Sequence, residues 1–230
     1  MVNNCINIIL DALFPSHCPL CLTPSSDVLC PGCMDDLPIN RHCCRRCAMP
    51  ITDPHSALCG HCLQAPPIID CSRIPFRYAD PIDQMIGQYK FSANLANGRI
   101  LSQLWLGHQQ TPVELPELLI PIPLHPERLC RRGFNQALEL ARPLGRHFGI
   151  AVDHKSCERV LNTPPQAGLK RQQRKQNLRG SFRLKQRLKV EHVALVDDVV
   201  TTGSTVFELA RLLKKSGIRR VDVWALARTP

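Results

Sequence analysis

The spacing of hydrophobic residues changes at about residue 70 of the chain. Before that point, residues 15–67 are rich in Pro, Ser and His, and their few apolar residues show little periodicity. After Pro66 and Pro67, short apolar runs alternate with segments whose apolar residues recur every three or four positions, as in helices. The pattern predicts a small module at residues 1–70 and a larger domain at residues 71–230.

The larger domain is predicted to alternate strands with helices. Ile82, Met85, Ile86 and Tyr89 follow a helical period after a strand-like run that begins at Cys71. Further helices are predicted at about 93–108, 135–148 and 204–216, and strands at 118–122, 157–161, 181–185, 192–196 and 221–227. This alternation predicts an α/β fold, with a mostly parallel sheet covered by helices on both faces.

Four C-x2-C pairs lie in the small module. They are Cys18 and Cys21, Cys30 and Cys33, Cys44 and Cys47, and Cys59 and Cys62. Each pair can direct two sulfurs at one ion, and two pairs complete the tetrahedral coordination of zinc. Because the module has so little apolar sequence, metal binding must supply much of its folding free energy. The spacing therefore predicts two structural zinc ions.

The pairing of these cysteines has alternatives. Pairing in sequence order needs only short loops, whereas a cross-braced arrangement would interleave the pairs. Cys43 could replace Cys44, and His17 or His61 could replace a sulfur, although a histidine beside a complete pair is more typical of the surface. We assign no chemistry to the five cysteines outside the pairs.

Charge and targeting signals narrow the possible partners and locations. The formal net charge is +10, and two ions held by four thiolates each lower it to about +6, so the protein stays basic. The apolar run from Ile6 to Phe14 is broken by Asp11 and is too short to span a membrane. The first Arg or Lys is Arg41, so we do not expect a secretory signal, which starts with positive charge. We expect a cytoplasmic protein without membrane insertion.

Residues 193–205, VALVDDVVTTGST, place Asp197 and Asp198 at the end of an apolar run. Val193 to Val196 is predicted to be a strand buried on both faces, and ligands of parallel sheets bind beyond the carboxyl ends of such strands. Next come hydroxyls and one glycine at the start of a helix, an arrangement that suits a phosphate. These residues are Thr201, Thr202, Gly203, Ser204 and Thr205. Carboxylates beside such a cradle suit a ribose 5-phosphate.

Other interpretations of this stretch fit less well. A P-loop needs a glycine followed by lysine, which does not occur in this chain. An acidic pair of the receiver type opens its domain, whereas only 32 residues follow Asp198. A capping cluster beside solvated aspartates would account for each feature but not for their adjacency.

The same thirteen residues resemble the 5-phosphoribosyl-1-pyrophosphate (PRPP) signature of type I phosphoribosyltransferases. In that family the acidic pair contacts the ribose hydroxyls and the following loop holds the 5-phosphate. The resemblance implies these roles for Asp197 and Asp198 and for residues 201–205, with Mg2+ bridging the diphosphate oxygens.

A second stretch, RRGFNQ at residues 131–136, follows the strand predicted at 118–122, where that fold places its pyrophosphate loop. Arg132, Gly133 and Phe134 resemble the loop of adenine phosphoribosyltransferases. Arginine beside glycine lets a fork of donors and bare backbone approach a diphosphate together. Arg131, Arg132 and Gly133 are therefore candidate pyrophosphate ligands, and the two arginines join the acidic pair as candidate catalytic residues. A solvated arginine pair at a helix start is the alternative.

Between Glu158 and Glu191 the chain has ten Lys or Arg residues and no acidic residue. Type I enzymes have a mobile loop in this place that closes over PRPP, so the resemblance implies Arg174 and Lys175 as further ligands. The same basic run suits the phosphates of single-stranded DNA, although Phe182 is its only aromatic residue.

The order of these features along nearly the whole chain is similar to the ComF/GntX family of competence and DNA-utilisation proteins. The resemblance implies transfer of phosphoribose to an unidentified acceptor in the uptake or use of external DNA, with DNA-uptake or helicase proteins as partners. The alternative is a non-catalytic protein that handles single-stranded DNA and keeps the PRPP pocket as a sensor or relic.

Overall fold

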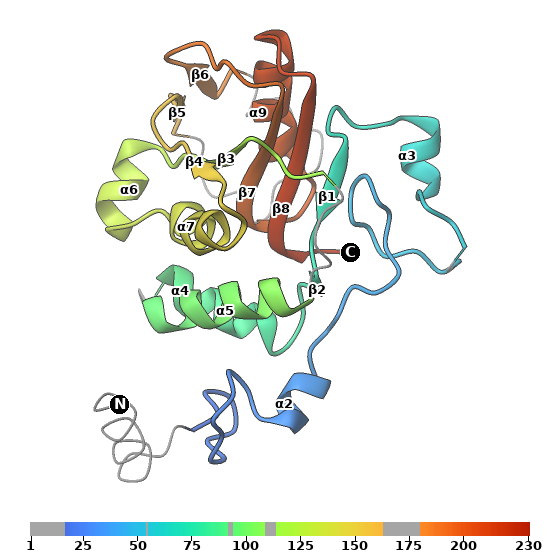
Figure 1. The fold of residues 1–230 in the computed structure, drawn as a ribbon, viewed down its shortest axis with the longest axis vertical. Coiled ribbons are helices and arrows are strands. Elements are labelled where there is room, and N and C mark those ends of the chain that lie inside the picture. The colour runs from blue at the N-terminus through green and yellow to red at the C-terminus, as the bar shows by residue number, and fades with distance from the viewer. Residues whose placement is uncertain (1–16, 54, 92–93, 109–113, 163–179) are drawn as a thin grey trace.

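The computed structural model describes residues 17–53, 55–91, 94–108, 114–162 and 180–230 (Figure 1). Within these ranges no helix combines the length and the apolar character that crossing a membrane requires.

A parallel sheet forms the centre of the larger domain. Its strands among the described residues are β1 (Cys71–Arg73), β2 (Phe76–Arg77), β3 (Leu118–Pro121), β4 (Ala151–Val152), β7 (His192–Val200) and β8 (Arg220–Arg228). The order is β1-β8-β7-β3-β4, β2 also pairs with β8, and every pairing is parallel. β7 and β8 are nearly continuous apolar runs, because central strands of parallel sheets are buried on both faces.

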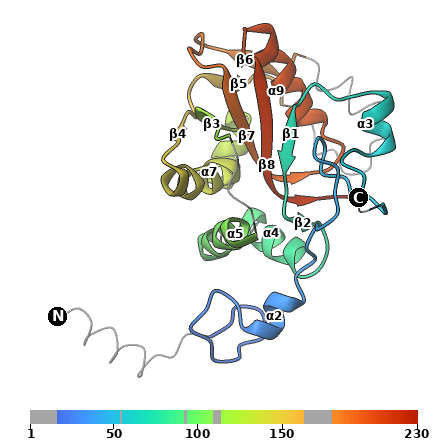
Figure 2. The same cartoon turned by 45° about the vertical axis from the view of Figure 1, so that its right-hand side comes forward.

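Helices cover both faces of this sheet. The described helices are α2 (Pro31–Asp35), α3 (Gly60–Gln64), α4 (Ile82–Phe91), α5 (Leu95–His108), α6 (Pro126–Arg132), α7 (Gln136–Phe148) and α9 (Ser204–Lys215). Figures 1 and 2 show α4, α5 and α7 on one side of the sheet and α9 on the other. Apolar side chains of these helices belong to the two buried clusters on the sheet. The predicted fold, a mostly parallel sheet between helical layers, is therefore confirmed.

The strands predicted at 157–161 and 181–185 form a sheet of their own. They are β5 (Cys157–Arg159) and β6 (Phe182–Leu184), which pair antiparallel and do not join the parallel sheet. The period of apolar residues identifies a strand but not its partner, so the sequence did not separate this hairpin from the main sheet. The short elements α6 and β4 were not predicted, because each has too few residues for a period.

The strand predicted at 192–196 is longer than expected. β7 continues to Val200, because β8 still pairs with it beyond the two aspartates, up to the partners Val200 and Arg228. On its other side β3 ends at Pro121, opposite Val196. The prediction that the aspartates follow the strand was therefore wrong: they lie within it, just past the end of its β3 neighbour.

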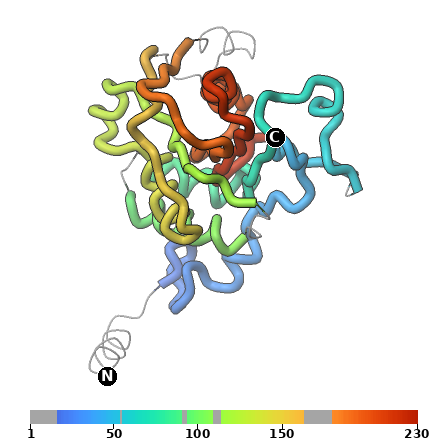
Figure 3. Tube along the Cα trace, turned by 45° about the horizontal axis from the view of Figure 1, so that its top comes forward, coloured from blue at the N-terminus to red at the C-terminus, as the bar shows by residue number. Residues whose placement is uncertain are grey.

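The two halves of the cysteine-rich module contact different parts of the larger domain. Leu29 and Leu37 of the first half belong to the same apolar cluster as the buried side chains of α4 and α5. In the second half, Ser72 of β1 donates from its amide to the carbonyl of Arg45 at 2.9 Å and from its hydroxyl to that of Arg46 at 2.7 Å. The C-terminal end of the chain also lies beside this second half (Figure 3).

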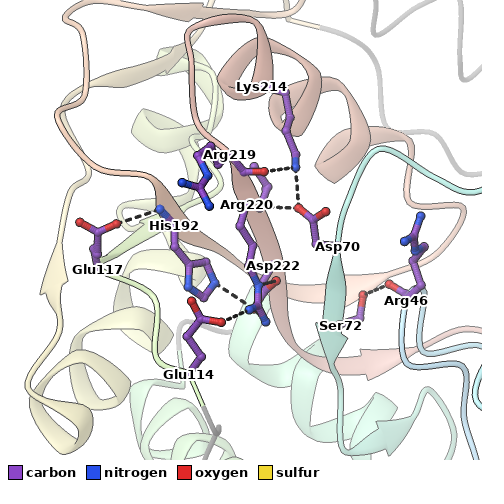
Figure 4. A network of polar contacts seen from close by, with 11 residues as sticks. Arg46, Asp70, Ser72, Glu114, Glu117, His192, Lys214, Arg219, Arg220 and Asp222 are labelled. Carbon is purple, nitrogen blue, oxygen red and sulfur yellow. Dashed lines mark hydrogen bonds and ion pairs between the residues drawn. The ribbon is translucent and has the colours of Figure 1, made fainter.

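A polar network joins the amino ends of β7 and β8 (Figure 4). His192 Nε2 lies 3.0 Å from Asp222 Oδ2, and the guanidinium of Arg220 contacts both oxygens of the same carboxylate at 3.1 Å. Asp70, just before β1, accepts from Lys214 Nζ at 2.7 Å and from the amide of Val221 at 2.8 Å. These contacts align β1, β7 and β8 at the end of the sheet opposite to the aspartate pair.

Candidate functional site

Asp197 and Asp198 point to opposite faces of the sheet, because neighbouring side chains of a strand alternate. Asp198 lies on the face covered by α4 and α7. Its Oδ2 lies 2.9 Å from Lys90 Nζ of α4 and accepts from Gln136 Nε2 of α7 at 3.3 Å. Tyr89 donates to the carbonyl of Gln136 at 2.9 Å and so joins the two helices beside the carboxylate.

Lys90 and Gln136 are contacts that the sequence did not predict. The period of α4 predicts a helix, but no pattern in the sequence relates a lysine at its end to an aspartate on β7. The charge of Asp198 raises the pKa of Lys90 against the effect of burial, so the lysine stays a cation. It is a counter-ion placed directly at the acidic pair.

The charge of Asp197 is balanced less well than that of Asp198. Burial is the main cause that raises the pKa of Asp197 to about 8, and the neighbouring charge of Asp198 adds to it. The amide of Asp198 donates to Asp197 Oδ1 at 2.9 Å, a bond that favours the charged form. A ligand that donates hydrogen bonds would also favour this charged form.

The residues after β7 form a turn that leads directly into α9. Gly203 is the N-cap of α9 with a φ of 76°, and a Cβ atom at this position would lie 2.5 Å from the ring of Phe207. The positive φ favours glycine, and the Phe207 ring would have to move to admit any side chain here. Thr202 Oγ1 lies 2.8 Å from Ser204 Oγ, while Thr201 is exposed and Thr205 is partly buried. The first amides of a helix have no partner within it, so this turn offers N–H groups and hydroxyls together.

The RRGFNQ stretch joins the end of α6 to the start of α7. Arg131 and Arg132 lie in the last turn of α6, and Gly133 ends that helix with a φ of 81°. The arginine pair therefore lies at the end of a helix. The alternative interpretation, a solvated pair, had placed it at a helix start. Asn135 begins α7: its side chain accepts from the amide of Ala137 at 3.0 Å and donates to the carbonyl of Ile122, just after β3, at 3.1 Å.

Four arginines influence one another near the acidic pair. Burial and the charges of Arg131 and Arg132 lower the pKa of Arg128. Burial and the charge of Arg128 lower the pKa of Arg159 in β5, while Asp197 opposes this shift. Like charges are therefore held close enough to repel, and an anion bound among them would relieve this repulsion. Arg128 and Arg159 were not singled out in the sequence, because they lie outside any motif.

A cavity of about 800 Å3 adjoins this arginine loop. It lies between α6, α7 and the β5–β6 hairpin, and its walls include Gly133, Phe134 and Arg159. Neither Asp197 nor Asp198 lines it, so the acidic pair lies outside this cavity. The predicted ligands Arg174 and Lys175 lie outside the described residues.

The eight cysteines of the C-x2-C pairs form two clusters, in sequence order. Cys18, Cys21, Cys30 and Cys33 make the first, and Cys44, Cys47, Cys59 and Cys62 make the second, with all sulfurs of a cluster within 4.8 Å of one another. Neither Cys43 nor a histidine belongs to a cluster, and no cross-braced pairing occurs among the described residues. Four sulfurs at this spacing match the donors that structural zinc requires.

Hydrogen bonds favour the thiolate form of Cys44 in the second cluster. Burial would raise the pKa of Cys44, but the backbone amides of Cys59, Cys47 and Arg46 outweigh it and lower the pKa to about 7. Zinc binds thiolates, so amide donors around the sulfur favour the form that the metal needs.

Comparisons with known proteins agree with both halves of the chain. The family model "Double zinc ribbon domain" matches residues 9–63. The chain is similar to DNA utilization protein YhgH of Escherichia coli K12, with 37% identity over 223 residues, 94% of this chain and 98% of the relative. It is also similar to Competence protein F of Haemophilus influenzae, with 35% identity over 220 residues, 92% of this chain and 95% of the relative.

A more distant relative is Competence protein ComFC of Streptococcus pneumoniae, with 24% identity over 157 residues, 68% of this chain and 67% of the relative. The first two similarities extend from the cysteine clusters through the parallel sheet. The chain therefore belongs to the ComF/GntX family, the family of DNA utilization protein YhgH and Competence protein F.

Proposed function

We propose that the protein binds PRPP together with Mg2+ and transfers its phosphoribosyl group to an acceptor in the uptake or use of external DNA. The observation that carries this proposal is the order of groups at the end of β7. Two carboxylates just past the end of β3, Asp197 partly exposed and Asp198 buried beside Lys90, are followed, within the same connection, by the N-cap turn of α9. One ligand of the size of ribose 5-phosphate can contact both.

The described residues fit the parts of such a ligand. Asp197 and Asp198 accept hydrogen bonds from the ribose hydroxyls, and residues 201–205 donate to the 5-phosphate. Arg131, Arg132 and the backbone of Gly133 bind the diphosphate, with Arg128 and Arg159 adding charge nearby. Mg2+ prefers phosphate and carboxylate oxygens, which the substrate and the acidic pair supply. Arg174 and Lys175 are proposed to close over the ligand.

The proposed reaction exchanges one bond at the anomeric carbon of ribose. The bond from this carbon to the pyrophosphate oxygen breaks, and a bond to the acceptor's nucleophilic atom forms. Positive charge develops on the sugar ring, as in glycoside hydrolysis, and negative charge on the leaving pyrophosphate. Asp197 and Asp198 position the ring, while Arg131 and Arg132 stabilise the leaving charge. The proton of the acceptor passes to water or to the pyrophosphate.

We place this activity in the cytoplasm, where reducing conditions keep cysteines available to zinc. We also propose that residues 1–70 form the zinc-binding domain and residues 71–230 the phosphoribosyltransferase-like domain. In this arrangement the zinc ions have a structural role, and the acceptor is bound by the larger domain.

A second candidate is a non-catalytic protein that handles single-stranded DNA and uses PRPP as a signal. The names of the relatives, which refer to DNA utilization and competence, favour it, as does the formal net charge of +10. DNA-uptake or helicase proteins are the proposed partners in this case. Turnover of PRPP separates the two candidates.

The test compares PRPP binding in two double variants. Mg2+ with PRPP should raise the Tm of the wild-type protein, because a ligand selective for the native state stabilises it. Asp197→Asn with Asp198→Asn should lose most of this shift. Asp35→Asn with Asp36→Asn is the matched control, since it neutralises another neighbouring pair, which is exposed in and after α2. An equal shift in both double variants would place the PRPP site elsewhere.

Release of pyrophosphate is then measured with nucleobases and related amines as acceptors. Turnover that needs one acceptor and disappears in Asp197→Asn with Asp198→Asn supports the transferase. Binding of PRPP without turnover for the acceptors tested supports the second candidate.

A further inference from the structure

Arg228, at the carboxyl end of β8, connects the second cysteine cluster to the turn before α9. The residue is 7% exposed. Its Nε donates to the carbonyl of Cys47 at 3.0 Å, and its Nη1 donates to the carbonyl of Val200 at 3.0 Å. Nη1 also donates to the carbonyls of Thr201 and Thr229. One guanidinium thus contacts a zinc-ligand residue, the last residue of β7 and the first residue of the turn.

The chemistry of arginine suits this position. Guanidinium presents several N–H donors in a rigid plane, so it can contact carbonyls from separate segments at the same time. Lysine carries a compact charge on a flexible stem and lacks this fork. The buried positive charge also lies beneath the turn that is proposed to hold a phosphate, where a low dielectric strengthens its attraction for an anion.

The backbone around Cys47 is held from both sides. Ser72 of β1 contacts the carbonyls of Arg45 and Arg46, and Asn40 Nδ2 donates to the carbonyl of Ala48 at 2.9 Å. Figure 4 shows the contact between Ser72 and Arg46 at the edge of the sheet. Zinc would fix the sulfur of Cys47, while these hydrogen bonds and Arg228 fix the backbone next to it.

We propose that Arg228 is a positioning residue for the turn at residues 201–203 and that it makes the geometry of this turn depend on zinc in the second cluster. The consequence for PRPP rests on the proposed function, but the coupling between zinc and the turn does not. Loss of zinc frees the sulfurs of residues 44–62, a segment with little apolar core, and the carbonyl of Cys47 loses its fixed position. Arg228 then holds the turn less firmly.

Three variants test the coupling by hydrogen exchange of the peptide that covers residues 200–206, without PRPP. Cys59→Ser removes a ligand of the second cluster but leaves Cys47 unchanged, and Cys21→Ser is its matched control in the first cluster. Zinc analysis should give two ions for the wild type and one for each of these variants. Exchange should become about tenfold faster in Cys59→Ser and in Arg228→Lys, and it should stay at the wild-type rate in Cys21→Ser. Equal exchange in the two cysteine variants would overturn the proposal.

A second measurement applies if Cys59→Ser does not fold, as judged by exchange in residues 192–196. Coupling is reciprocal, so Arg228→Lys should also release zinc from one of its two clusters faster than the wild type does, by about tenfold, when a chelator is added. Zinc release at the wild-type rate from both clusters would refute the coupling.

Titration of the same variants with PRPP and Mg2+ distinguishes this inference from the proposed function. If the wild type binds PRPP, its Kd should rise by about tenfold in Arg228→Lys and Cys59→Ser, and Cys59→Ser with Arg228→Lys should be no weaker than Arg228→Lys alone. If the two substitutions act independently, their effects on Kd multiply in the double variant, and this result would contradict the coupling. If the wild type does not bind PRPP, the proposed function fails, while hydrogen exchange and zinc release still decide the inference.

Discussion

Two neighbouring carboxylates on β7 differ in what balances their charge. Asp198 has Lys90 at 2.9 Å, whereas burial and the charge of Asp198 raise the pKa of Asp197 to about 8. An unfolded aspartate titrates near pH 3.9. Because the folded pKa is the higher one, the contribution of Asp197 to stability is fully present below about pH 4 and is lost as the pH rises through about 8. Keeping Asp197 ionised therefore costs stability, as is common at functional sites.

Asp197→Asn should consequently stabilise the protein, by about 1 kcal/mol or more at pH 9 and by much less at pH 5. Asparagine keeps the oxygen that accepts from the amide of Asp198 and removes the charge. Urea denaturation at pH 5, 7 and 9 measures the difference from the wild type. A difference that does not change with pH would show that folding does not raise the pKa of Asp197. The same variant should bind PRPP more weakly.

At the scale of elements, the connection between α6 and α7 depends on one side chain. Asn135 caps α7 and also donates to the carbonyl of Ile122, so it links the arginine loop to the end of β3. Gly133 ends α6 two residues earlier in the left-handed region. The position of Arg131 and Arg132 relative to the acidic pair therefore depends on the end of α6, on the start of α7 and on β3, which pairs with β7.

Asn135→Ala should lower the free energy of unfolding by about 1 kcal/mol, since it removes an N-cap. Asn135→Ser should keep most of the stability, because serine also caps helices, but it loses the bond to Ile122. Both variants should bind PRPP more weakly than the wild type, because both loosen the arginine loop from β3. Urea denaturation and calorimetric titration with PRPP and Mg2+ give the two quantities. Wild-type affinity in Asn135→Ser would mean that the bond to Ile122 does not position the loop.

At the scale of the whole molecule, both cysteine clusters contact elements that lead to the acidic pair or to the turn after it. The first cluster packs near α5 and near α4, which carries Lys90, and the second contacts the turn before α9 through Arg228. The basic run at residues 169–189 lies mostly outside the described residues. If it closes over PRPP and also holds DNA, the two ligands must compete.

We therefore expect saturating PRPP with Mg2+ to weaken binding of single-stranded DNA, and DNA to weaken PRPP binding by the same factor. The measurement is a titration of labelled DNA with and without PRPP, at fixed free Mg2+ and matched ionic strength. Identical DNA affinities in the two series would place the DNA site away from the basic run, with the zinc module as the next candidate.

The role of charge in this competition is tested by replacing four basic residues with glutamine at once. The chosen residues are Lys170, Arg171, Arg174 and Lys175. DNA affinity should fall, and its dependence on salt should flatten by about 0.7 for each DNA phosphate that the variant no longer neutralises. A control with equal loss of charge uses the exposed residues Arg99, Arg146, Arg211 and Lys215. A similar loss of DNA affinity in the two quadruple variants would mean that net charge, and not this run, attracts DNA.

The sequence by itself determined the features that depend on residues close together in the chain. The C-x2-C spacing identified all eight cysteines of the two clusters, because each pair needs only two residues between its sulfurs. The alternating periods predicted the parallel sheet and its helical layers, since burial on one or both faces determines where apolar residues recur. The contiguous stretch from Val193 to Thr205 likewise identified the candidate site, whose ligand stays a prediction.

Only the tertiary structure decided which distant residues meet at these places. Lys90 reaches Asp198 because α4 and α7 pack on the same face of β7, and a helical period carries no information about that partner. β5 and β6 leave the main sheet because they pair with each other, and strand propensity is the same in either sheet. Arg228 joins Cys47 to Val200 because β8 ends beside both. Such contacts depend on the folding of the whole chain, since no short segment contains both partners.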